Sequence, residues 1–148
     1  MSAFELDPRL AADSDLVANG PLSQLRLMDD TRFPWLLLVP RRAGAVEMLD
    51  LAERDQQELL GEIRLAAGTL RSGHRCDKLN IALLGNIVAQ LHVHVIARTR
   101  DDECWPAPVW GAGIARRADA ATRTGRVLAL RGALDQAFWK VPGTGDPD

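Results

Sequence analysis

Two histidines near the middle of the chain are the residues best suited to chemistry. His92 and His94 are separated by one residue within the apolar stretch QLHVHVIAR, and Gln90 lies two residues before the first of them. Successive side chains of a β-strand point to opposite faces, so a strand here places these three side chains on one face, about 6.5–7 Å apart. Imidazoles held on such a face could act as a nucleophile or as metal ligands.

Three interpretations of this histidine pair are open. In the first, each imidazole is a partly buried polar group satisfied by a hydrogen bond, the ordinary role of a single histidine. In the second, the pair binds a metal, although no Asp, Glu or Cys follows before Asp101 to complete the ligand set. In the third, a neutral imidazole attacks an electrophilic phosphorus while a backbone carbonyl fixes its other ring nitrogen.

Composition sets limits on the kind of protein. Apolar residues make up 47% and charged residues 26% of the 148-residue chain, and the net charge of −2 gives no attraction for nucleic acid. No apolar run reaches the ~18 residues that span a bilayer, and the N-terminus lacks the pattern of a signal peptide, so we expect a cytoplasmic protein without a membrane partner. Cys76 and Cys104 lack metal-site spacing, which favours free thiols.

Sequence patterns predict the strands that position the histidines. Residues 22–40 alternate and then run apolar around the break MDDTRFP, which predicts two strands joined by a turn. Residues 78–84 and 90–98 predict two further strands that pair antiparallel across a Gly-Asn turn region. The apolar face of the last strand would pack on a helix, and its polar face would line a groove open to solvent.

Two helices are expected in addition. Apolar residues recur at helical spacing over residues 51–72, with Asp50 as the predicted N-cap and Gly73 after the last turn. A second helix is predicted over residues 123–139. Together these elements make a single domain over residues 1–140, followed by a flexible tail over residues 141–148.

The stretch QLHVHVI resembles the motif of the histidine-triad (HIT) family, in which three histidines alternate with apolar residues, and Gln90 stands at the first of the three positions. The order of LRLMDDTRFPWLLLVPRR, the long helix, KLNIALLGN and QLHVHVIAR is also that of a HIT domain, so the resemblance covers residues 4–110. Together with CWPAPVWG, it is similar to bacterial HIT hydrolases. The resemblance implies an α+β fold: an antiparallel sheet of about five strands with one long helix and a C-terminal helix, in a homodimer.

The resemblance also implies a role for each matching residue. His92 matches the middle histidine, the nucleophile that attacks the α-phosphate of a nucleotide and forms a nucleotidyl-histidine intermediate. His94 matches the third histidine, which contacts the phosphate and the leaving group. Further matches imply phosphate binding by Asn80, Gly85 and Asn86, and ribose binding by Asp29 or Asp30. For either aspartate alone, initiation of the turn after the strand is an equally good explanation.

Gln90 is the departure from the family motif at the catalytic positions. An amide donates and accepts hydrogen bonds but cannot take up a proton, so any acid–base duty of the first histidine is lost. The resemblance implies a nucleotide hydrolase or nucleotidyl transferase acting at the α-phosphate of a phosphoanhydride, phosphoester or phosphoramidate, for example a dinucleoside polyphosphate. The alternative is a non-catalytic nucleotide-binding dimer, and a metal-centred hydrolase comes third. No cofactor is expected to be required, although Mg²⁺ could accompany a polyphosphate substrate.

Three tryptophans lie near these segments. Trp105 and Trp110 stand in the loop CWPAPVWG, where a subunit interface is favoured over stacking on a nucleotide base. Trp35 follows the hairpin turn, and its apolar neighbours favour packing.

Overall fold

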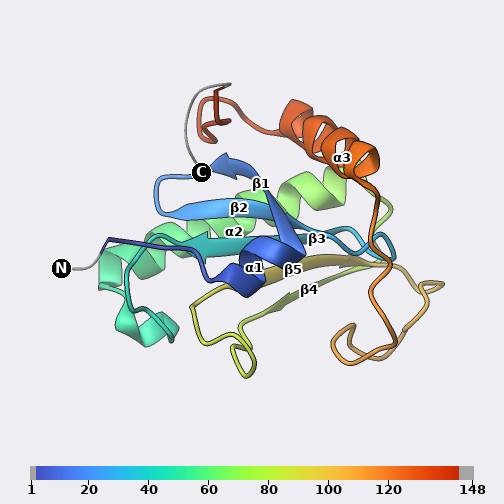
Figure 1. The fold of residues 1–148 in the computed structure, drawn as a ribbon, viewed down its shortest axis with the longest axis horizontal. Coiled ribbons are helices and arrows are strands. Elements are labelled where there is room, and N and C mark those ends of the chain that lie inside the picture. The colour runs from blue at the N-terminus through green and yellow to red at the C-terminus, as the bar shows by residue number, and fades with distance from the viewer. Residues whose placement is uncertain (1–2, 144–148) are drawn as a thin grey trace.

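The computed structural model describes residues 3–143, which form one five-stranded sheet with helices on both of its faces (Figure 1). This confirms the predicted α+β fold. Residues 144–148 of the predicted tail lie outside the described range. In chain order the elements are α1 (Pro8–Asp13), β1 (Ser14–Asn19), β2 (Ser23–Met28), β3 (Trp35–Pro40), the short 3-10 helix η1 (Met48–Asp50), α2 (Glu53–Gly73), β4 (Lys78–Ala82), β5 (Val93–Arg98) and α3 (Ala120–Ala133).

The sheet is antiparallel throughout, in the order β1-β2-β3-β5-β4. The predicted hairpin of β2 and β3 and the pairing of β4 with β5 are both confirmed. Strand β5 begins at Val93, three residues later than predicted. The N–H of Leu91 donates to the carbonyl of Ala45, which lies in a loop, so Leu91 does not pair with a neighbouring strand. Residues 83–92 therefore form a connecting loop that carries Gln90 and His92 up to the sheet.

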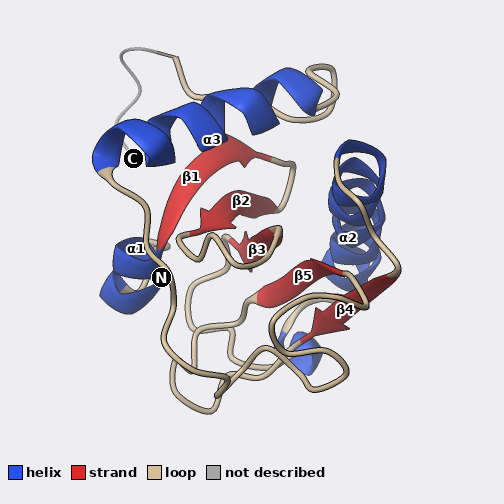
Figure 2. Cartoon of the chain, turned by 90° about the vertical axis from the view of Figure 1, so that its right-hand side faces the viewer, coloured by secondary structure: helices blue, strands red, loops and turns tan. Residues whose placement is uncertain are grey.

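One face of the sheet packs on α2, as Figure 2 shows. Leu59 and Leu70 of this helix share a core with Val93 and Val95 of β5, and Val127 of α3 joins the same core. The predicted packing of β5 on the long helix is therefore confirmed, and α3 lies on the same side of the sheet. None of the helices within residues 3–143 is long and apolar enough to cross a membrane.

The ends of the two helices differ from the prediction. Helix α2 starts at Glu53 with Ala52 as its N-cap, so the assignment of Asp50 to that role was wrong. The Asp50 carboxylate instead accepts hydrogen bonds from the N–H groups of Val46 and Glu47 and closes the turn of η1. Helix α3 ends at Ala133 and not at residue 139, because the chain turns at 135–138 and then adds a β-bridge between Asn19 and Lys140.

The opposite face of the sheet is also covered. Helix α1, which the sequence patterns did not predict, lies over this face, and strand β1, also not predicted, continues from it as the edge strand of the sheet (Figure 2). A second apolar core forms there from Leu10, Phe33, Trp35, Leu37, Val39, Ile96 and Val109. The prediction of a polar face open to solvent was therefore wrong, because α1 near the N-terminus and the loop after β5, which carries Val109, both pack on it.

Candidate active site

The two histidines lie side by side under this cover. His92 is the last residue before β5, His94 is the second residue of the strand, and their ring centroids are 4.8 Å apart. Their exposed fractions are only 7% and 5%. A nearly fixed pair of imidazoles, shielded from bulk water, is suited to attack on a phosphorus atom by one ring with assistance from the other.

A backbone carbonyl fixes the orientation of His92. Its Nδ1 lies 2.6 Å from the carbonyl oxygen of Gln90. A carbonyl can only accept, so Nδ1 carries the proton and Nε2 keeps a free lone pair. This is the tautomer that a nucleophilic imidazole requires.

Trp35 fixes the other histidine. The indole N–H of Trp35 donates to Nδ1 of His94 at 3.1 Å, so the proton of a neutral His94 ring is on Nε2. Burial, and to a smaller extent the charge of His92, lowers the pKa of His94 from 6.5 to about 3. His94 is therefore neutral at physiological pH and can donate a hydrogen bond from Nε2.

Tryptophans surround His94 on further sides. The Trp110 ring lies 5.2 Å from the His94 ring and 6.2 Å from the Trp35 ring. Trp105 lies against the Arg98 guanidinium at 5.7 Å. Trp105 and Trp110 are both only partly buried within their own chain, and the subunit interface that the sequence favours for them stays a prediction. Trp35 packs as expected, but its hydrogen bond to His94 was not anticipated.

A buried arginine holds the loop that carries these tryptophans. Arg98, 1% exposed, forms an ion pair with Asp102 at 2.6 Å and donates to the carbonyl of Ala107 at 2.9 Å. It also donates to the side-chain oxygen of Asn80 at 2.9 Å. This role of Arg98 was missed, although its position signals it: Arg98 follows His94 by four residues on the same face of β5.

The predicted phosphate-binding residues lie on β4, which pairs with β5, and on the loop after it. Ala82 pairs with His94 and Asn80 pairs with Ile96, so Asn80 lies on the same sheet face as His94. Since the Asn80 oxygen is bonded to Arg98, its NH₂ group is the part that could meet a phosphate. Gly85 has a positive φ of 77°, which glycine adopts without strain, and Asn86 beside it is exposed.

A sequence comparison decides to which family this arrangement belongs. The HIT domain model matches residues 9–101, which include Gln90, His92 and His94. The chain belongs to the histidine-triad family. Residues 9–101 span β1 to β5, so the family match and the observed sheet coincide.

Solved structures of bacterial HIT proteins are similar to the whole chain. A histidine-triad protein from Bradyrhizobium japonicum is 45% identical, with a TM-score of 0.85 over 90% of this chain and 100% of its own. A HIT protein from Sinorhizobium meliloti 1021 is 44% identical, with a TM-score of 0.84 over 88% of this chain and 97% of its own. A histidine-triad protein from Marinobacter aquaeolei VT8 is 36% identical, with a TM-score of 0.87 over 91% of this chain and 98% of its own. No curated protein matches the chain.

Two acidic residues of the HIT domain follow β2 and are buried. One oxygen of Asp29 accepts from the N–H of Ala118 at 3.0 Å, and the other lies 3.4 Å from Arg123. Burial acts to raise the pKa of Asp30, but hydrogen bonds from Arg32 outweigh it and hold that pKa below its ordinary value. Both carboxylates thus bind to other segments of the same chain. Ribose binding by either residue stays a prediction. Within residues 3–143, no group of three or more His, Cys, Asp or Glu side chains is placed to hold a metal ion.

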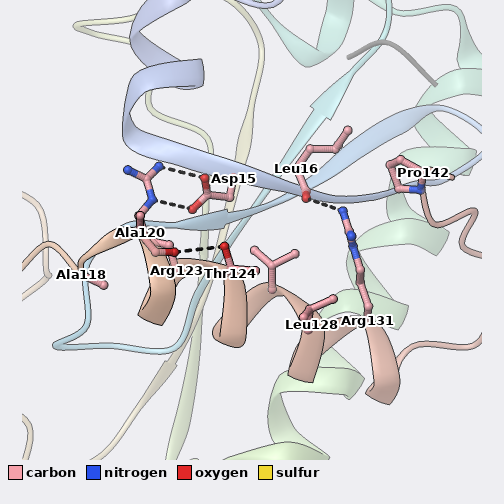
Figure 3. Close-up of a pocket in the computed structure, with 10 residues that line it drawn as sticks. Asp15, Leu16, Ala118, Ala120, Arg123, Thr124, Leu128, Arg131 and Pro142 are labelled. Atoms are coloured by element: carbon pink, nitrogen blue, oxygen red, sulfur yellow. Dashed lines mark hydrogen bonds and ion pairs between the residues drawn. The ribbon is translucent and has the colours of Figure 1, made fainter. Parts of the chain in front are cut away.

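A separate hollow lies between β1 and α3 (Figure 3). Arg123 and Asp15 form an ion pair at 2.8 Å within it, and Arg131 donates to the carbonyls of Leu16 and Val17. These charged groups bind α3 to the edge of the sheet. The hollow contains none of the residues of the histidine site.

Proposed function

We propose that this HIT protein hydrolyses a nucleotide substrate at its α-phosphate, with His92 as the nucleophile. The observation that carries this proposal is the 2.6 Å hydrogen bond between Nδ1 of His92 and the Gln90 carbonyl, which leaves the Nε2 lone pair free. Membership of a family that binds nucleotides supplies the substrate class. The substrates are nucleoside phosphoanhydrides, phosphoesters or phosphoramidates, with dinucleoside polyphosphates as an example.

In the first half of the reaction, Nε2 of His92 forms a bond to the α-phosphorus. The bond from phosphorus to the leaving group breaks and the leaving atom keeps the electron pair. A leaving phosphate oxygen departs as the anion, and a leaving nitrogen takes up a proton from solvent as the bond breaks. Neutral His94 donates a hydrogen bond from Nε2 to the phosphate or the departing atom. The Asn80 NH₂ group, Asn86 and backbone N–H groups near Gly85 stabilise charge on the phosphate oxygens.

In the second half, a water molecule attacks the phosphorus of the nucleotidyl-His92 intermediate. The N–P bond breaks, and the lone pair returns to Nε2. The product is a nucleoside monophosphate, and the water supplies its new oxygen and the protons. The histidines need no metal in this scheme, and Mg²⁺ accompanies the substrate only where that substrate is a polyphosphate.

A second candidate function is nucleotide binding without turnover. Gln90 favours it, because the side chain at the first motif position cannot exchange protons. Thermal-shift measurements with nucleotides detect binding under both hypotheses, so only release of product separates them.

The functional unit that we propose is a homodimer. Strand β4 is an edge of the sheet, and apolar side chains along it and the following loop are exposed: Ile81, Leu83, Leu84 and Ile87, at 45%, 42%, 45% and 84%. Such a patch at an unpaired strand favours association. Light scattering on the wild type and on Leu83→Lys tests this, with a dimer expected for the former and a monomer for the latter. A monomeric wild type would contradict it.

The experiment for the reaction is chromatographic detection of AMP released from diadenosine tetraphosphate and from an adenosine phosphoramidate. We expect release by the wild type and a loss of about a thousandfold or more in His92→Asn, which still binds nucleotide. His94→Asn keeps a hydrogen-bonding group and is expected to lose less. Binding by the wild type with no AMP from either substrate would favour the non-catalytic hypothesis.

A further inference from the structure

The side chain at the first motif position makes contacts that an acid–base group would not require. The Gln90 amide oxygen accepts from the N–H of Asp7 at 2.8 Å, and its amide nitrogen donates to the carbonyl of Glu5 at 2.8 Å. One planar group thus pairs with two backbone groups of an extended segment, as a strand partner would. These two bonds, made by Glu5, Asp7 and Gln90, are called the N-terminal latch below.

The latch acts on the same residue that orients the nucleophile. The backbone carbonyl of Gln90 accepts the Nδ1–H of His92, and its side chain is held at both amide atoms. A residue fixed at its side chain has less freedom to rotate its backbone. The latch therefore restrains the carbonyl that sets the tautomer and direction of His92.

A second connection reinforces the latch. Arg9 donates to the carbonyl of Ile87 at 2.9 Å, and its guanidinium is held by the Asp7 carboxylate at 3.1 Å. The N-terminal segment is therefore bonded to the loop before β5 at two places, residues 87 and 90. Hydrogen bonds from Arg9 also lower the pKa of Asp7, which keeps the Asp7 carboxylate charged for this ion pair.

We propose that Gln90 is a positioning residue, whose latched side chain holds its own carbonyl in place for His92, and that the N-terminal segment is thereby part of the catalytic apparatus. The effect on reaction rate rests on the function proposed above. In this account the glutamine at the first motif position has a structural role of its own. It supplies the donor and the acceptor that the segment needs.

Two variants and one control test the latch. Gln90→Met removes both hydrogen-bonding atoms of the amide at similar side-chain length. Gln90→Glu keeps an acceptor for the N–H of Asp7 but loses the donor to the carbonyl of Glu5. The control is Gln56→Met, because the Gln56 amide donates to the backbone carbonyl of Leu51 at 3.0 Å at the start of α2. It makes the same type of bond at another place in the chain.

The first two readouts do not depend on activity. In ¹⁵N-labelled protein we expect the Asp7 amide to exchange with solvent at least tenfold faster in Gln90→Met, while the Leu91 amide, bonded to Ala45, is unchanged. The ring nitrogens of His92 should report one tautomer in the wild type and a mixture in Gln90→Met. Gln90→Glu should lie between them, and Gln56→Met should match the wild type.

The third readout is the rate of hydrolysis. We expect kcat to fall at least tenfold in Gln90→Met with KM changed less than threefold. An unchanged His92 tautomer in Gln90→Met would overturn the proposal, whether or not Asp7 exchanges faster. A fall in kcat/KM that comes only from a higher KM, with kcat unchanged, would overturn it too, since Gln90 would then act through substrate binding. If the wild type releases no AMP, the proposed function fails, and the tautomer and exchange data still decide on the latch.

Discussion

Trp35 of β3 and His94 of β5 are joined across the sheet by a hydrogen bond of 3.1 Å between the indole N–H and Nδ1. Both side chains are nearly buried, at 5% exposed each. The bond holds the proton of His94 on Nε2, and the depressed pKa keeps the ring neutral. A donor whose position and protonation are both fixed is what the proposed reaction needs beside its nucleophile.

Removal of the indole donor tests this relationship. Trp35→Phe leaves Nδ1 of buried His94 without a partner, and we expect a loss of about 1–3 kcal/mol in the free energy of unfolding and slower hydrolysis. Urea unfolding measures the first, and AMP release the second. The control is Trp110→Phe, because the buried Trp110 N–H has no hydrogen-bond partner within the described structure. An equal loss of stability in both variants would contradict the assigned role of the bond.

The low pKa of His94 predicts how stability depends on pH. The unfolded chain takes up a proton at His94 near pH 6.5, while the folded protein takes it up only near pH 3. Below pH 6.5 the unfolded state thus binds more protons, and this residue lowers stability by about 1.4 kcal/mol per pH unit on acidification until pH 3.

Urea unfolding of wild type and His94→Asn at pH 7, 6 and 5 isolates this contribution. As the pH falls, the wild type should lose more unfolding free energy than the variant, because only the wild type carries His94. A difference that stays constant between pH 7 and pH 5 would show that His94 ionises in the folded protein as it does in the unfolded chain.

A glycine at the end of β1 supports the fold. A Cβ at Gly20 would lie 2.4 Å from Oε1 of Glu62 and 2.7 Å from the Trp139 ring. Glu62 is fully buried, and the same oxygen accepts from the N–H groups of Leu22 and Ser23. Gly20→Ala should therefore destabilise the protein by about 1–3 kcal/mol, as measured by urea unfolding.

The matched control for that substitution is Gly132→Ala in α3. A Cβ there meets nothing within 4 Å, and alanine favours helix, so a gain of about 0.5–1 kcal/mol is expected. If both substitutions cost the same, the close packing at Gly20 would not be the cause.

The buried ion pair of Arg98 and Asp102 should stabilise the loop after β5, which carries Trp105 and Trp110. Arg98→Met leaves the Asp102 carboxylate buried without its cation, which costs about 3–5 kcal/mol. Adding Asp102→Asn removes that charge, keeps an acceptor for the N–H groups of Cys104 and Trp105, and should restore part of the loss. Urea unfolding followed by tryptophan fluorescence measures both.

An exposed ion pair provides the comparison. Arg75 and Asp101 pair at 2.8 Å with side chains 68% and 65% exposed, so Arg75→Met should cause no measurable change. Equal effects of Arg98→Met and Arg75→Met would mean that the loop does not depend on the buried pair.

Strands β2 to β5 and the two longer helices could be predicted because their signals are local. The hairpin around MDDTRFP and the helical spacing over α2 are visible within short stretches of sequence. The pattern also indicated that His92 and His94 lie close together, as they do, although Gln90 and His92 belong to the loop before β5 and not to the strand. The cap of α2 was misplaced because Asp50 bonds to the nearer N–H groups of Val46 and Glu47.

The cover over the histidines could not be predicted, because it comes from contacts between distant parts of the chain. Gln90 meets Asp7 across 83 residues, and Trp35 meets His94 across 59. Helix α1 has only six residues, too few for a clear periodic pattern. Such long-range contacts turned an expected open groove into a buried site.

The most direct test of the central claim is intact-protein mass spectrometry after a short, quenched incubation with diadenosine tetraphosphate or an adenosine phosphoramidate. We predict a mass increase of one AMP on the wild type that is lost in acid and absent from His92→Ala. An adduct of the same mass on His92→Ala would assign the nucleophile to another residue. Nucleotide binding with neither adduct nor AMP release from either substrate would contradict covalent catalysis by His92.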